Sequence, residues 1–512
     1  MTAPKELEIK LEVAPASVPS LKKIPLIRTL KTRPRRTTET SVYFDTEKQK
    51  LRKNGLLLRV RRIGNRYIQT IKADAHAGLL ERNEWEAEIA GEQPDLSLAD
   101  GTALAPLVSG KLRRQLRPLF ETRVRRTVYP LSDDKRSIAL TIDQGKIDTG
   151  TRSAPLCEIE LELKRGSEAE LFDVARELSA PLAAQLALKS KSERGYELVD
   201  GAGDEPVKAA DVHLAAGMSA RDAFQVIGRA CFKHAIDNEP ALRKGDPEGV
   251  HQMRVGLRRL RTAMSLFADL LREAPTAAIK GELKWLSREL TPARELDVLM
   301  SRAVAPVKKR RARFAGVPSL SQELADKRKA ALTRAQDAVT SARFRALTLD
   351  VAAWLETGPW LDPSDDLVRD RGTVPIDAAA AAQLTRRWRK IRKKGKALAE
   401  LDGRRRHKLR IRAKKLRYAA EFFADLFPGK QAAKRRDKFL AALERLQDGL
   451  GDLNDIAVHE DIMGATARRR TSRKLAFAAG LVTGREDARL DAAMATATEA
   501  HAKLAKLKPF WR

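Results

Sequence analysis

Cysteine, aromatic residues and long hydrophobic runs are scarce in this 512-residue sequence, and each scarcity excludes a class of protein. The two cysteines, Cys157 and Cys231, form neither a disulfide framework nor a metal motif, so we expect a reducing compartment, the cytoplasm. Aromatic residues make up only 5% of the chain, which argues against base stacking on single-stranded nucleic acid. No run of 18 apolar residues occurs, and the acidic first twelve residues lack an apolar core. Neither membrane association nor a signal peptide is therefore predicted.

The motifs of several common chemistries are also missing. The sequence has no glycine-rich phosphate loop of the strand-to-helix type, so a P-loop mechanism is not expected. No Ser-His-Asp or Cys-His grouping stands out. Charged residues, in contrast, make up 33% of the chain, and any chemistry must come from them.

Positive charge is abundant and unevenly distributed. The formal net charge is +31, and residues 201–512 carry 63 lysines and arginines against 39 acidic residues. This excess should attract a polyanion. The shortage of aromatic residues favours a polymer of phosphate over nucleic acid, which we do not expect as a specific partner.

The chain divides into two parts with different patterns. Residues 1–200 show strand-like alternation, for example in 66–72, 84–89, 123–129 and 138–143, with helical insertions at 16–30, 106–118 and 167–180. A polar linker follows at 201–211. Residues 212–510 lose the strand signal and show helical spacing throughout. We therefore predict an α+β domain followed by an all-α domain.

Charged residues of both signs alternate along the predicted strands of the first part. Glu6, Glu8 and Lys10 share one face of a strand whose other face is apolar. A closed antiparallel barrel would bring such faces into one lumen. There, carboxylates would hold hard divalent cations, and lysine and arginine would neutralise an oligophosphate. Phosphoryl transfer is the chemistry that needs both sets together.

Seven short motifs in residues 1–200 follow one another in a specific order and together resemble the CYTH domain, the triphosphate tunnel metalloenzyme family. They are Glu6-x-Glu8-x-Lys10, Tyr43-Phe-Asp-Thr46, Leu58-Arg59-Val-Arg61, Thr70-Ile-Lys72, Arg82-x-Glu84-x-Glu86, Glu158-x-Glu160-x-Glu162-Leu-Lys164 and Ser190-Lys191-Ser-Glu-Arg-Gly-Tyr196.

The resemblance implies an eight-stranded antiparallel tunnel that binds a linear triphosphate and Mg²⁺ or Mn²⁺. The residues it assigns to phosphate are Lys10, Arg59, Arg61, Lys72, Arg125 and Lys191. Those it assigns to metal are Glu6, Glu8, Glu84, Glu86, Glu158 and Glu160, and the catalytic set is Glu6, Glu8, Lys10, Glu158 and Glu160. Two points of register stay open: which two of Glu158, Glu160 and Glu162 bind metal, and whether Arg123 or Arg125 contacts phosphate.

The helical part contains an internal repeat. Two segments read His-x-x-Arg-x-x-x-(Arg/Lys)-x-x-Arg, which places the four residues on one helix face. The repeated positions are His251, Arg254, Arg258 and Arg261, and His407, Arg410, Lys414 and Arg417. The duplication predicts two similar helical bundles about a pseudo-twofold axis. Two such faces turned toward each other would form a basic groove for a chain of phosphates.

These two segments, with Leu450-Gly-Asp-Leu-Asn-Asp455, resemble the CHAD domain, a helical family associated with inorganic polyphosphate. The resemblance covers about residues 212–510 and assigns polyphosphate binding to the eight repeated positions. It is compatible with a cytoplasmic location on polyphosphate granules.

The two resemblances together predict a metal-dependent phosphohydrolase that cleaves inorganic triphosphate to pyrophosphate and phosphate, with a helical domain that binds polyphosphate. Three alternatives stay open. The tunnel could act on an organic triphosphate such as thiamine triphosphate or ATP. The protein could be a non-catalytic polyphosphate scaffold, although inward carboxylates would hinder pure anion binding. The basic part could bind nucleic acid non-specifically.

Overall fold

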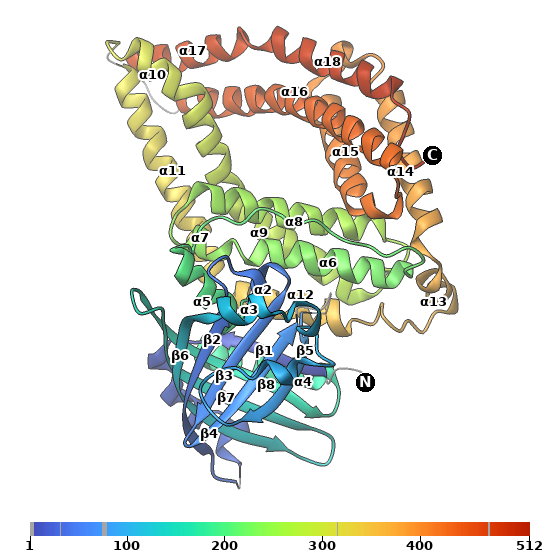
Figure 1. Cartoon of the computed structure of the whole chain (residues 1–512). Coiled ribbons are helices and arrows are strands. Elements are labelled where there is room, and N and C mark those ends of the chain that lie inside the picture. The colour runs from blue at the N-terminus through green and yellow to red at the C-terminus, as the bar shows by residue number, and fades with distance from the viewer. Residues whose placement is uncertain (1–4, 31, 74–78, 315, 469–471) are drawn as a thin grey trace. The chain divides into compact units, whose positions relative to one another are not determined.

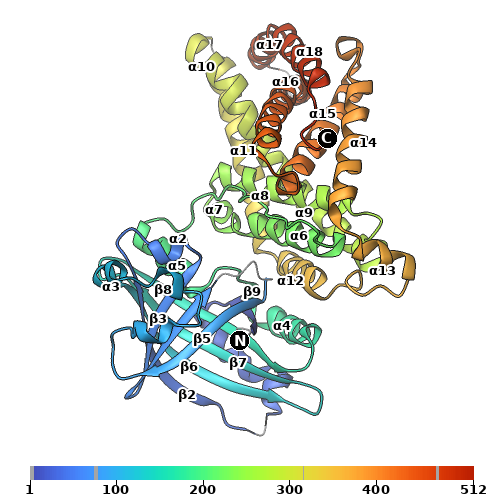
Figure 2. The ribbon, with the colours of Figure 1, turned by 45° about the vertical axis from the view of Figure 1, so that its right-hand side comes forward.

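The computed structural model describes residues 5–30, 32–73, 79–314, 316–468 and 472–512. The chain forms two compact units (Figures 1 and 2). Unit 1 comprises residues 1–205 together with 340–358, and unit 2 comprises residues 206–339 and 359–512.

Unit 1 is built on a single antiparallel sheet of nine strands in the order β5-β4-β3-β2-β6-β7-β8-β1-β9. An additional pairing of β5 with β1 closes the first eight strands on themselves, so the predicted eight-stranded tunnel is confirmed. The strands are β1 (Lys5–Glu12), β2 (Arg35–Asp45), β3 (Leu56–Ile63), β4 (Arg66–Ala73), β5 (Glu81–Ile89), β6 (Arg117–Ser132), β7 (Ser137–Asp148), β8 (Ser153–Arg165) and β9 (Gln185–Leu186).

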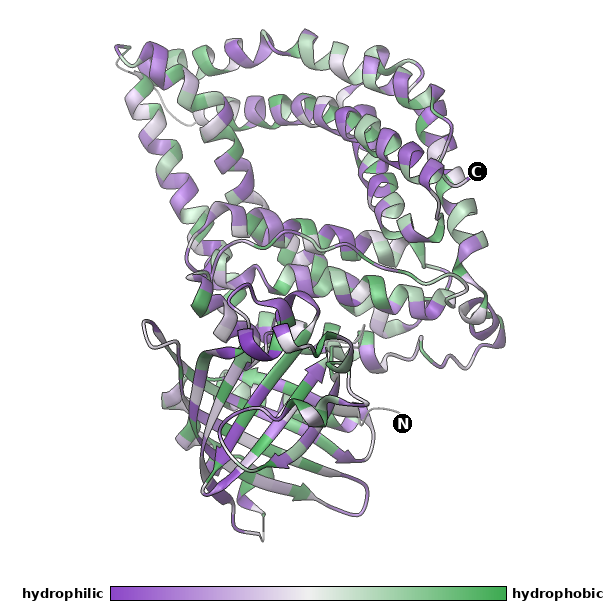
Figure 3. Cartoon of the chain, viewed as in Figure 1, coloured by the Kyte–Doolittle hydropathy of each residue, from purple (hydrophilic) through white to green (hydrophobic). Residues whose placement is uncertain are grey.

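Alternation of side chains explains how these strands form a tunnel with a charged interior. Figure 3 shows hydrophilic and hydrophobic residues alternating along the strands. Tight turns fix the register: Gly64, with φ of +59°, lies in the turn between β3 and β4, where a side chain would be strained. Because alternate residues face opposite sides, one face of each strand lines the tunnel and the other packs outward.

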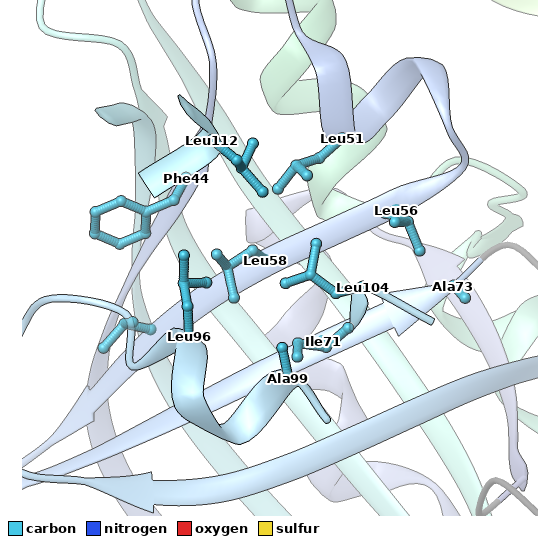
Figure 4. Packing of buried hydrophobic residues seen from close by; sticks show 11 residues of the cluster. Phe44, Leu51, Leu56, Leu58, Ile71, Ala73, Leu96, Ala99, Leu104 and Leu112 are labelled. Atoms are coloured by element: carbon cyan, nitrogen blue, oxygen red, sulfur yellow. The ribbon is translucent and has the colours of Figure 1, made fainter. Parts of the chain in front are cut away.

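An apolar cluster covers the outer face of β2, β3 and β4 (Figure 4). The strands contribute Phe44, Leu58, Val60 and Ile71, and the segment 96–112 contributes leucines that pack over them. Burial of these side chains contributes about 1.5–3 kcal/mol each. The short elements here are η2 (Leu96–Ala99), η3 (Ala105–Leu107), α2 (Lys50–Lys53) and α3 (Gly110–Gln115).

Helices accompany the sheet elsewhere in unit 1, and one of them comes from a distant part of the sequence. The local ones are η1 (Pro15–Lys23), α1 (Pro25–Arg28), α4 (Glu168–Leu182) and α5 (Lys191–Asp200). The distant one is α12 (Ala342–Thr357), which packs against α4 and β9. Arg176 of α4 pairs with Asp350 at 3.0 Å, and the backbone N–H of Leu79 donates to Glu356.

Unit 2 is helical over its described residues. In Figure 1, α8 and α9 lie on the side opposite α16, α17 and α18. The helices are α6 (Ala220–Ile236), α7 (Glu239–Arg243), α8 (Pro247–Leu266), α9 (Ala274–Val298), η4 (Leu299–Val304), α10 (Ala305–Arg311), α11 (Gly316–Thr340), α13 (Asp366–Thr373), α14 (Ile376–Lys394), η5 (Leu398–Glu400), α15 (Gly403–Phe422), η6 (Ala424–Leu426), α16 (Lys430–Arg468), α17 (Arg473–Asp487) and α18 (Leu490–Lys506).

The sequence repeat falls on two matching helices, α8 and α15, which contact each other. Both have 20 residues, and both begin after an aspartate whose side chain caps the first turn: Asp246 before α8 and Asp402 before α15. In the described part of the chain, the length and apolarity that a bilayer crossing requires are not met by any helix.

Candidate functional site

The register of β1, β7 and β8 brings the acidic residues of three strands onto one wall of the tunnel. Lys10 lies opposite Glu160, and Glu160 lies opposite Thr141. Two residues earlier on β8, Glu158 lies opposite Asp143 of β7. Directly paired residues share a face of the sheet, so these side chains all point into the lumen.

Asp143, Glu158 and Glu160 form a tight carboxylate cluster. One oxygen of each lies within 4.8 Å of the others. Asp143 and Glu158 are fully buried. Glu158 has two cations beside its carboxylate among the described residues, Lys191 at 2.6 Å and Arg194 at 3.6 Å. Three convergent carboxylate oxygens are the donors that Mg²⁺ and Mn²⁺ prefer, so the cluster fits such a metal.

Three cations neutralise this acidic wall. The Lys191 ammonium lies 2.6 Å from Glu158, 2.7 Å from Asp143 and 2.9 Å from Glu160. Arg126 donates to both oxygens of Asp143, at 2.8 and 2.6 Å, and lies 3.1 Å from Glu160. Lys10 pairs with Glu8 and lies 3.6 Å from Glu160.

The balance of burial and charge decides how these groups ionise. Burial raises the pKa of Glu158 above its ordinary value. Burial acts in the same direction on Glu160, but the ammonium groups of Lys191 and Lys10 hold its pKa well below the ordinary value. Burial would lower the pKa of Lys191, yet the carboxylates around it raise that pKa well above its usual value. Lys191 therefore stays a cation at neutral pH.

Helix α5 positions Lys191 at the first turn. Ser190 caps the helix through the backbone N–H of Glu193, and the Glu193 side chain bonds back in a capping box. Further along α5, Tyr196 packs among Tyr43, Phe120 and other inward-facing apolar residues and donates a hydrogen bond to Asp45 at 2.9 Å. Helix α5 therefore fills part of the tunnel and fixes the place of Lys191.

Strands β3, β4 and β5 form a second, basic wall. Lys72 pairs with Glu84 at 2.9 Å, and Arg59 lies 3.5 Å from the same carboxylate. Arg61 pairs with Glu86 at 2.7 Å and lies 3.5 Å from Glu39. Arg59, Arg61 and Lys72 are each less than one-fifth exposed, and Glu86 is the most accessible carboxylate of this wall.

Four cations of α8 and α15 form a second candidate site, in unit 2. Arg254 and Arg258 of α8 lie near Arg410 and Lys414 of α15, and each of the four influences the ionisation of another. No ion pair joins any of the four to a carboxylate among the described residues. Burial and the neighbouring arginines lower the pKa of Lys414 to about 6 and that of Arg254 to about 10. Glu295 and Asp455 offset this positive charge only in part, so the cluster favours an anionic ligand.

The remaining repeated positions take different roles. Burial and Arg294 lower the pKa of His251 to about 4, so it is neutral at pH 7. His407 is exposed and bonds to Asn454 at 2.7 Å. Arg261 is exposed, and Arg417 is already paired with Glu421 and Glu444. The structure brings together four of the eight predicted residues.

Both parts of the chain match known families. Residues 4–196 match the CYTH domain family, and residues 226–464 match the CHAD domain family. The chain is a CYTH domain followed by a CHAD domain. The segment of α12 falls within the CHAD match, although the helix packs in the same unit as the CYTH strands.

Individual relatives resemble parts of this chain. An inorganic triphosphatase from Haemophilus influenzae is 29% identical over 171 residues, which cover 31% of this chain and 45% of that protein. The chain thus spans less than half the length of that relative. A crystal structure of the CHAD domain from the plant Ricinus communis is 27% identical, with a TM-score of 0.52, covering 60% of this chain and 98% of that one. PptA from Streptomyces chartreusis is 20% identical, with a TM-score of 0.40 and coverage of 55% and 99%.

The CYTH tunnel contains most of the residues predicted for it, with one error of register. Arg125, predicted to contact phosphate, is exposed on the outer face and donates to Gln144; Arg123 also points outward. Arg126 occupies the inward position instead. In Arg-Val-Arg-Arg both registers place arginines on one face, so alternation could not choose between them.

The β8 carboxylates can now be distinguished. Glu158 and Glu160 belong to the acidic cluster, whereas Glu162 is more exposed and pairs with Lys164. The side chain of Glu6, predicted as a metal ligand, lies outside the described part of the structure. Glu84 and Glu86 pair with the basic wall, away from the acidic cluster.

Sequence reasoning missed three buried charges of the tunnel. Asp143 was noted for its strand position but not assigned to the site; Arg126 and Glu39 were not singled out. The signal for Asp143 was available, because it ends the alternating segment 138–143. Glu39 lies between threonines and gives no such pattern.

Proposed function

We propose that the CYTH domain hydrolyses inorganic triphosphate to pyrophosphate and phosphate with Mg²⁺ or Mn²⁺, and that the CHAD domain binds polyphosphate. One observation carries the first half: a closed tunnel in which a buried carboxylate cluster faces a wall of arginines and a lysine. The relative from Haemophilus influenzae is an inorganic triphosphatase, which supports this choice of substrate.

Each wall has its own task in this mechanism. Asp143, Glu158 and Glu160 would hold the divalent cation, which would supply Lewis-acid activation of a phosphoryl group and of water. Arg59, Arg61 and Lys72 bind the phosphate chain and stabilise charge that develops on its oxygens. The tunnel would surround the bound triphosphate and limit the access of bulk water to it, which strengthens these interactions.

To bind the basic wall, the substrate must displace the carboxylates that pair with its cations. Lys72 pairs with Glu84 and Arg61 pairs with Glu86. A triphosphate offers these cations a denser negative charge, so it replaces the carboxylates as partner. Released carboxylates would then be free to hold a second cation.

A substrate panel on the full-length protein tests the reaction. We expect release of phosphate from inorganic triphosphate with Mg²⁺ or Mn²⁺, and little from thiamine triphosphate or ATP. Glu158→Gln should lower turnover at least about 100-fold, because it removes a buried metal-ligand charge. Glu177→Gln, at an exposed position on α4, is the matched control. Faster cleavage of an organic triphosphate would replace the proposed substrate. Unchanged turnover in Glu158→Gln would refute the proposed metal site, and no phosphate release from any triphosphate of the panel would favour a scaffold.

Binding of polyphosphate to the CHAD domain is tested separately. In the full-length protein, Arg258→Ala combined with Arg410→Ala should weaken polyphosphate binding at least about tenfold while triphosphate hydrolysis continues. Arg261→Ala with Arg404→Ala, both exposed on the same helices, is the matched control. Nucleic acid that long-chain polyphosphate fails to displace at fixed salt would contradict this assignment.

A further inference from the structure

Lys191 occupies the centre of the carboxylate cluster. Its ammonium lies within 2.9 Å of an oxygen on Asp143, Glu158 and Glu160, and these three residues are the ones whose oxygens converge for a metal. Lys191 is 8% exposed, and the nearest other cation to Glu158 is Arg194, at 3.6 Å. One ammonium thus serves three buried carboxylates at once.

A divalent cation and this ammonium would compete for the same oxygens. Mg²⁺ binds carboxylate oxygens at about 2.1 Å, and an ammonium needs about 2.8 Å. The converging oxygens all lie within 4.8 Å of one another, so a metal among these carboxylates and the ammonium beside them would repel each other at short range. Binding of one therefore requires departure of the other.

The carboxylates need one of the two cations at all times. Asp143 and Glu158 are fully buried, and a buried carboxylate without a partner costs several kcal/mol. Arg126 is committed to Asp143 through two hydrogen bonds, and Lys10 lies closest to Glu8. Glu158 has no such second partner within hydrogen-bond distance among the described residues.

Lys191 can leave the cluster without moving its helix. The capping box at Ser190 fixes the backbone of the first turn of α5. The four-carbon lysine side chain rotates freely about its bonds and carries its charge at a single atom, unlike the rigid fork of arginine. A change of rotamer alone would therefore take the ammonium off the carboxylates.

We propose that Lys191 is a built-in counter-cation that holds the carboxylate cluster together until a divalent metal displaces its ammonium into the lumen, where it becomes a ligand for phosphate. This inference rests on the proposed metal site. When a metal binds, the released Lys191 ammonium becomes an additional cation for phosphate, so the two sites form together. It also means that the protein binds free metal more weakly than the carboxylates alone would allow.

Binding of Mn²⁺ alone to the full-length protein tests the inference without any substrate. Titration calorimetry should show that Lys191→Met binds Mn²⁺ at least about tenfold more tightly than wild type, because no ammonium competes. With EDTA the variant should unfold at a lower temperature than wild type, and Mn²⁺ should raise its unfolding temperature more. Lys164→Met, which removes an exposed lysine of β8, should behave as wild type.

A second variant keeps the test decisive if Lys191→Met does not fold. Lys191→Arg retains the charge and adds bidentate bonds, so it should bind Mn²⁺ more weakly than wild type. Unchanged or weaker Mn²⁺ binding by Lys191→Met, or equal binding by Lys191→Arg, would overturn the inference. Absence of Mn²⁺ binding in wild type and variants alike would overturn it too. Tighter Mn²⁺ binding by Lys191→Met, together with no triphosphate hydrolysis by the wild-type protein, would support the inference and refute only the proposed function.

Discussion

At the scale of single residues, Arg125 and Arg126 are adjacent in sequence and face opposite sides of the sheet. Arg126→Ala removes the bidentate partner of Asp143, which is fully buried. We expect a loss of about 3 kcal/mol of unfolding free energy and of most hydrolytic activity, because the buried carboxylate of Asp143 loses two hydrogen bonds and keeps only Lys191 as its cation. Arg125→Ala should change stability by less than about 0.5 kcal/mol. Urea unfolding and phosphate release measure both; equal effects would show that the register is misassigned.

Lys414 makes the CHAD site sensitive to pH. Burial and three arginines (Arg258, Arg410 and Arg254) lower its pKa to about 6, against the opposing effect of Asp455, whereas an unfolded lysine titrates near 10.4. Between these values the unfolded state binds more protons, so this group makes the fold more stable as pH rises from about 6 to 10. A polyphosphate chain favours the protonated form.

Polyphosphate binding by this site should therefore weaken as pH rises from 5.5 to 8, with uptake of a proton on binding at pH 8. Calorimetry in buffers of different ionisation enthalpy measures the proton uptake. Lys414→Arg, which stays protonated throughout, should bind with a flatter pH profile. A wild-type profile as flat as that of the variant would show that Lys414 does not contact the ligand.

At the scale of elements, the packing of α5 against the sheet depends on a glycine. A Cβ added at Gly195 would lie 2.0 Å from the ring of Phe120, which stacks on Tyr43 and meets Tyr196 edge-on. Gly195→Ala should therefore displace α5 and cost about 1–3 kcal/mol, with a fall in activity because Lys191 moves with the helix. Gly203→Ala, where a Cβ would meet open space, is the control. Combining Gly195→Ala with Phe120→Leu should recover part of the loss, measured by thermal unfolding and phosphate release.

The elements themselves were largely predictable, because alternation and helical spacing are local properties. The strand at 138–143 appears where the pattern placed it, and closure of eight strands follows from the family resemblance. The pairing of Lys191 with three carboxylates was not predictable, since it depends on how α5 enters the tunnel. Spacing along α15 places Glu421 beside Arg417, but it could not show that Glu444 of α16 would also pair with this arginine.

At the scale of the whole molecule, the two compact units do not follow the order of the chain. The sequence predicted a boundary at 201–211, and unit 1 does end its first segment at residue 205. Residues 340–358 nevertheless return to unit 1, although helical spacing before and after them gives no sign of the change. Which unit a helix joins depends on its tertiary contacts, and α12 finds its contacts on α4 and β9.

Because residues 340–358 pack in unit 1, α12 contributes to the stability of the tunnel domain. Ala352 lines a small cavity with Leu80, Leu186 and Ala187, beside the backbone of β1, and Glu356 accepts a hydrogen bond from Leu79. A fragment of residues 1–205 lacks these contacts and exposes apolar surface of β9, so it should unfold at a lower temperature than the same unit in the full chain.

A synthetic peptide of residues 340–358 provides the decisive comparison. Added to the fragment, it should raise the unfolding temperature in a concentration-dependent manner, because it binds only the folded form. The same peptide with Asp350→Ala and Ala352→Glu should stabilise less, since it loses the pair with Arg176 and places a charge in the cavity. A fragment as stable as the full-length unit, indifferent to either peptide, would show that α12 is a neighbour of the tunnel and no part of it. Loss of stability that the peptide restores would mean that the CHAD sequence supplies a structural element of the CYTH unit, so that neither domain can be understood from its own segment of the chain.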